Sequence, residues 1–169
     1  EYTKGDKYVG IDMELAALLA EKLGKELVIE NMDFDAVCLS VSQQKCDIAM
    51  AGLTINEERE KYVTFTDSYY SASQRLIVPS NDTAFDDCKS ADDVAAKLAE
   101  LKESDKIGVQ QGTTGDIYST DDFGDDNVER FNKGMEAVQA LQQGKIDAVI
   151  IDNQPAKTCL LYTSPSPRD

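Results

Sequence analysis

The chain has 169 residues, 32 acidic and 17 basic side chains, a formal net charge of −15 and a pI near 4.3. This charge argues against binding to nucleic acid or to an anionic membrane surface, because both are themselves negatively charged. The sequence contains no histidine, which excludes Ser-His-Asp and Cys-His catalysis and His-ligated metal sites. The length suffices for one sizeable hydrophobic core or for two small ones.

Cysteine spacing and hydropathy narrow the class further. Cys38, Cys46, Cys88 and Cys159 show no C-x-x-C spacing, so neither a zinc site nor a thioredoxin-like motif is predicted. We interpret Cys38 and Cys46 as reduced core residues. No apolar run approaches the roughly 20 residues that span a bilayer, and no signal peptide is recognisable.

The first half of the chain alternates short apolar runs with helical patterns. Gly24 is expected to end the first helix, which Asp12 would cap. This β-α-β-α-β series predicts a mainly parallel sheet flanked by helices. The expected elements are strands at Tyr8–Val9, Leu27–Ile29 and Ile48–Ala51, and helices at Met13–Leu23 and about 34–44.

The alternation restarts after a polar loop at 80–83. Ser90 and Asp93 form a capping-box pattern before one helix, and Thr113 and Asp116 form another cap pair. In both halves a strand delivers polar groups onto a helix start, which is the sheet edge where α/β proteins bind ligands. The expected elements are strands at Arg75–Pro79, Lys106–Val109, Val128–Phe131 and Ala148–Ile151, with helices after Ser90, after Thr113 and at Met135–Gln143.

The stretch 51–59 has the composition of a receptor for a small carboxylate. Asn56 is a suitable N-cap for a short helix that begins with two glutamates. Arg59, at the third helical position, opposes the helix dipole by about 0.3–1 kcal/mol, so another interaction is expected to hold it there. Two interpretations stand: Arg59 receives a carboxylate together with Thr54 and backbone N–H groups, or it is a surface residue paired with Glu57 or Asp67.

Other candidate sites have simpler interpretations. Glycines at 108, 112 and 115 lack the Gly-Lys-Ser/Thr of a phosphate loop. The run Asp121–Asn127 is rich in oxygen ligands but does not match the EF-hand spacing, so it is interpreted as a solvated acidic turn. From local sequence alone Asp152 is either a helix cap or the partner of an ammonium group, and Phe34 is a core residue.

Several blocks, taken in order, nevertheless resemble the amino-acid-binding family of bacterial extracytoplasmic solute-binding proteins, the capture components of polar amino-acid ABC importers. The resemblance runs from the first residue to about Ala156. The blocks that carry it are Gly10-Ile11-Asp12-Met13-Glu14-Leu15, Asp33-Phe34-Asp35, Lys45-Cys46-Asp47-Ile48-Ala49, Ala51-Gly52-Leu53-Thr54 with Arg59, Phe65-Thr66-Asp67-Ser68-Tyr69-Tyr70, Gly108-Val109 to Gly115, and Asp147-Ala148-Val149 to Asp152.

The resemblance implies an α/β, two-lobed clamshell of the type II periplasmic-binding-protein kind, each lobe a mainly parallel sheet flanked by helices. The expected division is a first lobe at 1–75, a hinge crossover strand at 76–80, a second lobe at 81–156 and a tail at 157–169. The implied function is binding of a free, polar amino acid for delivery to an ABC transporter permease. The expected protein is a monomer, periplasmic or lipid-anchored outside the cell, with no cofactor, metal or catalytic residue.

The resemblance also implies roles for individual residues. Arg59 would pair with the α-carboxylate of the ligand, assisted by Thr54, the backbone at Ala51 and Gly52, and Thr114. Asp152 would receive the α-ammonium, and Phe34 would lie against the ligand side chain. Gln110 and Thr113 would line the far wall.

The chain departs from the family pattern at both ends. The family's first strand is expected to be missing before Glu1, and the run Leu161–Asp169 resembles nothing in the family and is interpreted as non-native. A fragment with an incomplete first lobe is therefore expected. Two alternative functions stay open on the same fold: an enzyme similar to cyclohexadienyl and arogenate dehydratases, and the sensing domain of a membrane receptor.

Overall fold

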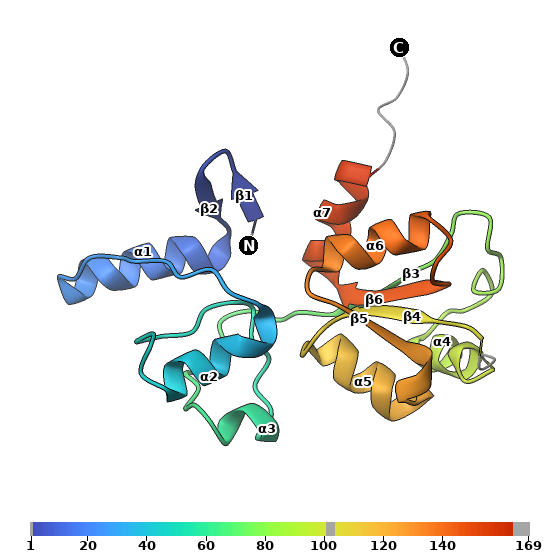
Figure 1. The fold of residues 1–169 in the computed structure, drawn as a ribbon, viewed down its shortest axis with the longest axis horizontal. Coiled ribbons are helices and arrows are strands. Elements are labelled where there is room, and N and C mark those ends of the chain that lie inside the picture. The colour runs from blue at the N-terminus through green and yellow to red at the C-terminus, as the bar shows by residue number, and fades with distance from the viewer. Residues whose placement is uncertain (1, 101–103, 164–169) are drawn as a thin grey trace, which may run out of the picture. The chain divides into compact units, whose positions relative to one another are not determined.

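The computed structural model describes residues 2–100 and 104–163. The chain divides into two compact units, Glu1–Ala72 and Ser73–Asp169, which we call unit 1 and unit 2 (Figure 1). No helix among the described residues is long and apolar enough to cross a membrane.

Unit 1 consists of a hairpin followed by helices. Its two short strands pair antiparallel, with Tyr2 opposite Val9. The first helix ends at Gly24, which adopts the left-handed conformation and donates its N–H to the helix, as predicted. The elements are β1 (Tyr2–Lys4), β2 (Lys7–Val9), α1 (Ile11–Leu23), the 3-10 helix η1 (Phe34–Ala36), α2 (Val37–Ser42) and α3 (Glu57–Glu60).

Two strands expected in unit 1 are wrong. The segments 27–29 and 48–51 form no ladder in the described structure, and Val28 is 70% exposed and Ile48 51% exposed. An apolar run indicates a strand only where another strand pairs with it, since pairing is what offsets the ordering of the backbone. Within the described residues, a mainly parallel sheet is therefore found in unit 2 and not in unit 1. The helix expected over 34–44 is split into η1 and the shorter α2.

Unit 2 forms a four-stranded sheet in the order β3-β6-β4-β5. The pairs β6–β4 and β4–β5 are parallel, and β3 pairs antiparallel with β6. The predicted strands and helices of this half are confirmed, with shifts of one or two residues at their ends. The elements are β3 (Gln74–Ile77), α4 (Ala91–Leu98), β4 (Ile107–Gln110), α5 (Thr114–Phe123), the 3-10 helix η2 (Asp125–Asn127), β5 (Val128–Phe131), α6 (Gly134–Gln142), β6 (Ala148–Asp152) and α7 (Asn153–Thr163).

Helices cover both faces of this sheet, so unit 2 has two cores. Val149 and Ile151 pack with α6 and α7 on one face, while Ile150 packs with Ile107 and Val109 on the face that α4 and α5 cover (Figure 1). This alternation follows from the period of two along a strand. Because both faces of the central strands are buried, β4 and β6 have the near-continuous apolar sequences typical of parallel sheets.

Three further expectations concern the hinge strand, the cysteines and the C-terminal run. The strand β3 belongs to the sheet of unit 2, and a hinge at 76–80 stays a prediction. Cys38, Cys46 and Cys88 are free, with Cys38 buried and Cys46 half-buried. The run interpreted as non-native is helical up to Thr163, and its remainder lies outside the described residues, as does the side chain of Cys159.

Candidate functional site

The turn that precedes α3 in unit 1 positions Arg59. Asn56 is in the extended conformation, and its side-chain oxygen accepts the backbone N–H of Arg59 at 2.9 Å, so the predicted N-cap is confirmed. This cap fixes where α3 begins. The cap also fixes the direction in which its third residue, Arg59, leaves the helix.

Arg59 is buried rather than exposed. Only 9% of the residue is accessible, which makes the interpretation as a surface arginine wrong. Its Nη1 donates to the carbonyl oxygen of Thr54 at 2.7 Å, and its guanidinium carbon lies 5.3 Å from the centre of the Phe34 ring. A cation over an aromatic face is attracted to it. Unit 1 therefore brings together three of the expected site residues, and it places Phe34 against the guanidinium rather than in an apolar core.

Asp12 has a different role from the predicted helix cap. The helix α1 begins at Ile11, so Asp12 lies inside its first turn, and its N-cap position, Gly10, has no side-chain cap bond. The buried carboxylate of Asp12 accepts the backbone N–H of Gly52 and the hydroxyl of Tyr69, each at 2.7 Å. Since the Gly52 N–H is occupied in this way, the backbone of Gly52 can offer a ligand its carbonyl oxygen.

The corresponding turn of unit 2 links β4 to α5. Thr113 caps α5: its hydroxyl accepts the N–H of Asp116 at 3.3 Å and donates to the carbonyl of Gln110 at 2.7 Å. Thr114 is the first helical residue, and the first N–H groups of a helix have no partner within it. The side chain of Gln110 donates to the carbonyl of Asn132 at 3.2 Å. Gln110, Thr113 and Thr114 therefore lie together at the end of β4.

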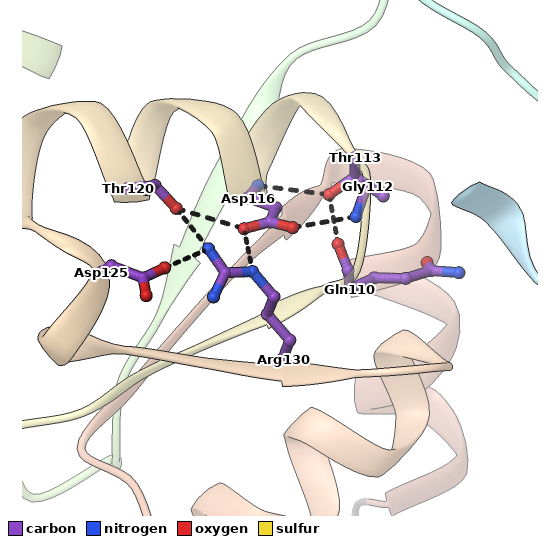
Figure 2. Close-up of polar contacts among 7 residues, drawn as sticks. All are labelled: Gln110, Gly112, Thr113, Asp116, Thr120, Asp125 and Arg130. Carbon is purple, nitrogen blue, oxygen red and sulfur yellow. Dashed lines mark hydrogen bonds and ion pairs between the residues drawn. The ribbon is translucent and has the colours of Figure 1, made fainter.

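Sequence reasoning missed an ion-pair network at this turn, centred on the buried Asp116 and shown in Figure 2. Asp116 accepts the N–H of Gly112 at 2.9 Å with one oxygen and Nε of Arg130 at 2.9 Å with the other. Arg130 also reaches the Thr120 hydroxyl and Asp125, each at 2.8 Å. Arg130 lies in β5 beside another exposed residue, Glu129, and no local signal in the sequence indicated its partner Asp116, which lies 14 residues away.

The network also affects the titration of Arg130. Partial desolvation lowers the pKa of the guanidinium, but the carboxylates of Asp125 and Asp116 together outweigh this effect, and the pKa is raised. The run 121–127, interpreted as a solvated acidic turn, keeps Asp125 exposed but uses it to pair with Arg130.

Asp152 ends β6 and lies beside Gln74, its register partner on β3. The side-chain amide of Gln74 donates to the Oδ1 atom of Asp152. The other polar atom of that amide, Oε1, is buried and has no hydrogen-bond partner in the described structure. Ala51, the remaining expected site residue, is half-buried next to Gly52. No group of three His, Cys, Asp or Glu side chains that could hold a metal ion occurs within the described ranges.

Comparison with known proteins gives a consistent result. Residues 1–116 match the family of bacterial extracellular solute-binding proteins, family 3. The arginine-binding extracellular protein ArtP of Bacillus subtilis is 31% identical over 156 residues, which are 90% of this chain and 56% of that protein. The chain thus spans about half the length of the curated relatives it matches.

Two solved structures extend the likeness to the fold. A mutant of arginine-bound ArgBP from T. maritima has 33% identity and a TM-score of 0.82, covering 95% of this chain and 70% of that one. An ancestral amino acid-binding protein, a precursor of cyclohexadienyl dehydratase, has 30% identity and a TM-score of 0.79. The match covers 92% of this chain and 66% of that one. The fold is that of the type II periplasmic binding proteins. The chain belongs to the bacterial extracellular solute-binding proteins, family 3.

Proposed function

We propose that this protein binds a free amino acid outside the cytoplasm and delivers it to an ABC transporter permease. The observation that carries the proposal is Arg59, a buried guanidinium oriented by the Thr54 carbonyl and by the Phe34 ring, in a chain of this family. A guanidinium has five N–H donors in a planar fork that suits a carboxylate.

Each end of the ligand then has a partner of opposite charge. Arg59, with the Thr54 hydroxyl and the backbone at Ala51, takes the α-carboxylate, and Thr114 of unit 2 adds a hydroxyl. Gly52, whose N–H is held by Asp12, offers its carbonyl oxygen to the α-ammonium. Asp152 takes the α-ammonium, and the bond from Gln74 fixes one of its oxygens. Such pairing selects zwitterions, because a ligand that lacks either charge leaves its partner desolvated and unpaired. The remaining ligand-binding residues proposed are Phe34, against the ligand side chain, and Gln110 and Thr113, along the far wall.

The ligand we propose is a polar amino acid, and L-arginine is the first to test. Relatives and solved neighbours of this chain are named as arginine- or histidine-binding proteins. We further propose a periplasmic or lipid-anchored location and a monomeric state, which suits a protein that releases its ligand to a membrane permease.

A thermal-shift screen of the chain against the L-amino acids tests this function. Ligand at 100 times its Kd stabilises the folded state by about 2.7 kcal/mol, which raises the Tm of a domain of this size by several degrees. Arg59→Lys keeps the charge but loses the bidentate fork, so it should weaken binding by about 10-fold or more. Arg75→Ala removes an exposed arginine that bonds Asn153 and is the matched control; its shift should equal that of the wild type.

The outcome that contradicts the proposal is a chain that melts cooperatively and shifts with none of the amino acids. Turnover of arogenate or prephenate would instead establish a dehydratase, the alternative raised by the neighbour that is a precursor of such an enzyme. That neighbour is itself an amino acid-binding protein, so we propose binding without turnover for this chain.

A further inference from the structure

We infer that Asp12 and Asp116 are positioning residues, each of which holds the turn that presents one half of the amino-acid receptor. The inference rests on the proposed function, because it concerns the same site. The two turns are residues 51–54 of unit 1 and 110–114 of unit 2, called here the first and second glycine turns. The first leads to Thr54 and Arg59, and the second carries Gln110, Thr113 and Thr114.

In unit 1 the carboxylate of Asp12 connects three parts of the chain. It stands on α1, is 3% exposed, and bonds the Gly52 N–H and the Tyr69 hydroxyl, which are 40 and 57 positions away in the sequence. Gly52 has a φ of 59°, in the left-handed region that side chains disfavour. Asp12 therefore fixes the left-handed residue from which the chain runs on to Thr54 and the start of α3.

In unit 2 the carboxylate of Asp116 makes the same kind of contact. It is 7% exposed and accepts the N–H of Gly112, whose φ is 73°. Its second oxygen accepts from Arg130 and from the Thr120 hydroxyl, at 2.9 and 3.3 Å (Figure 2). The cation neutralises the buried charge, so Asp116 can stay ionised and accept the Gly112 N–H with a charge-assisted bond.

The detail that separates positioning from ordinary helix capping is which N–H Asp116 accepts. In a capping box the third helical residue reaches back to the N–H of the cap residue itself. Asp116 instead accepts from Gly112, one residue before the cap, while Thr113 supplies the cap bond to the helix. The carboxylate therefore fixes the turn rather than α5 alone.

The physical effect expected is preorganisation. A glycine turn outside regular structure is free to change conformation, and ordering it when the ligand arrives would subtract from the affinity. With both turns held beforehand, Thr54 and Thr114 are in place before binding. The two units use unrelated parts of the sequence for the same arrangement: a buried carboxylate bonded to the N–H of a left-handed glycine.

The test compares Asp12→Asn and Asp116→Asn with Asp125→Asn in the full chain. An asparagine keeps the shape but loses the charge and can present an N–H to the glycine N–H. Asp125 bonds the same Arg130 and does not reach the turn, which makes it the matched control. Calorimetric titration uses L-arginine as the probe or, if that gives no heat, the tightest of the other L-amino acids. We expect Kd to rise about 10-fold for the first two variants and to stay unchanged for Asp125→Asn.

Amide NMR supplies a readout that global stability does not move. In the wild type without ligand, the Gly52 and Gly112 amide protons should be protected from exchange. The Gly112 resonance should shift in Asp116→Asn and stay in place in Asp125→Asn. Unprotected glycine amides overturn the inference even if a variant fails to fold.

The failures of the two proposals differ. If the wild type binds an amino acid and Asp12→Asn and Asp116→Asn bind as tightly as Asp125→Asn, the positioning role is overturned and the function stands. If the wild type binds none of the amino acids, the proposed function is overturned and the positioning role falls with it.

Discussion

At the scale of single residues, charge placement was informative where it conflicted with the expected local structure. The position of Arg59 at the start of a helix predicted another interaction, which the structure shows as the Thr54 carbonyl and the Phe34 ring. Because α3 is only one turn long, Arg59 also lies in its last turn, so the dipole itself does not oppose it. Asp12 and Arg130 gave no such signal. An aspartate near a helix start is explained by capping, and an arginine next to a glutamate in a short strand by solvent exposure, so their distant partners could not be predicted.

The contact between Phe34 and Arg59 predicts an energetic coupling. A double-mutant cycle of Phe34→Leu and Arg59→Gln, followed by denaturant unfolding, should give about 0.5–2 kcal/mol, the range of a cation over an aromatic ring from exposed to desolvated. Leucine keeps apolar volume at position 34, so the cycle reports the ring. Strictly additive effects would show that the ring and the guanidinium do not interact.

At the scale of elements, the sequence predicted unit 2 well and unit 1 poorly. Each strand of unit 2 has its partners and covering helices within the unit, so an apolar run such as Ala148–Asp152 becomes a strand. In unit 1 the runs at 27–29 and 48–51 have the same local pattern without a ladder. The hydrophobic pattern can be read from one segment alone, whereas a strand forms only when a second segment pairs with it.

The helix α4 predicts a pH dependence. Asp93 accepts the N–H groups of Lys89 and Ser90, and these bonds, together with the one from the Ser90 side chain, lower its pKa below the ordinary 3.8. A lowered pKa stabilises the fold fully above the unfolded value and loses that effect as pH falls through the folded value.

The wild type should therefore be more stable than Asp93→Asn between pH 5 and 7, the range of full ionisation. The difference in unfolding free energy between the two proteins should narrow below about pH 4. Chemical unfolding of both proteins across this range measures it. A stability difference that widens on acidification would contradict the lowered pKa of Asp93.

At the scale of the whole molecule, the two units differ in how much of their apolar surface they bury. Unit 2 has two cores around β4 and β6, with Val109 and Val149 fully buried. Unit 1 exposes several large apolar side chains, among them Leu18, Leu23 and Val28. Local opening is easiest where few apolar contacts must be broken.

Hydrogen exchange read by mass spectrometry should therefore separate the units. Peptides that cover β4 and β6 should exchange slowest, and those that cover residues 25–33 should exchange fastest. The same experiment with saturating amino acid should slow exchange at both glycine turns. Equal protection across the two units would contradict the difference in burial.

Recognition of an amino acid through its carboxylate is the central claim, and a calorimetric titration of the wild-type chain tests it most directly. The two titrants are the amino acid that gives the largest thermal shift and the same molecule without its α-carboxylate, which for L-arginine is agmatine. We predict saturable binding of the amino acid and a Kd for the decarboxylated analogue weaker by about 10-fold or more, since Arg59 is left without its anion. Equal binding of both compounds, or binding of neither by a folded chain, would contradict the account.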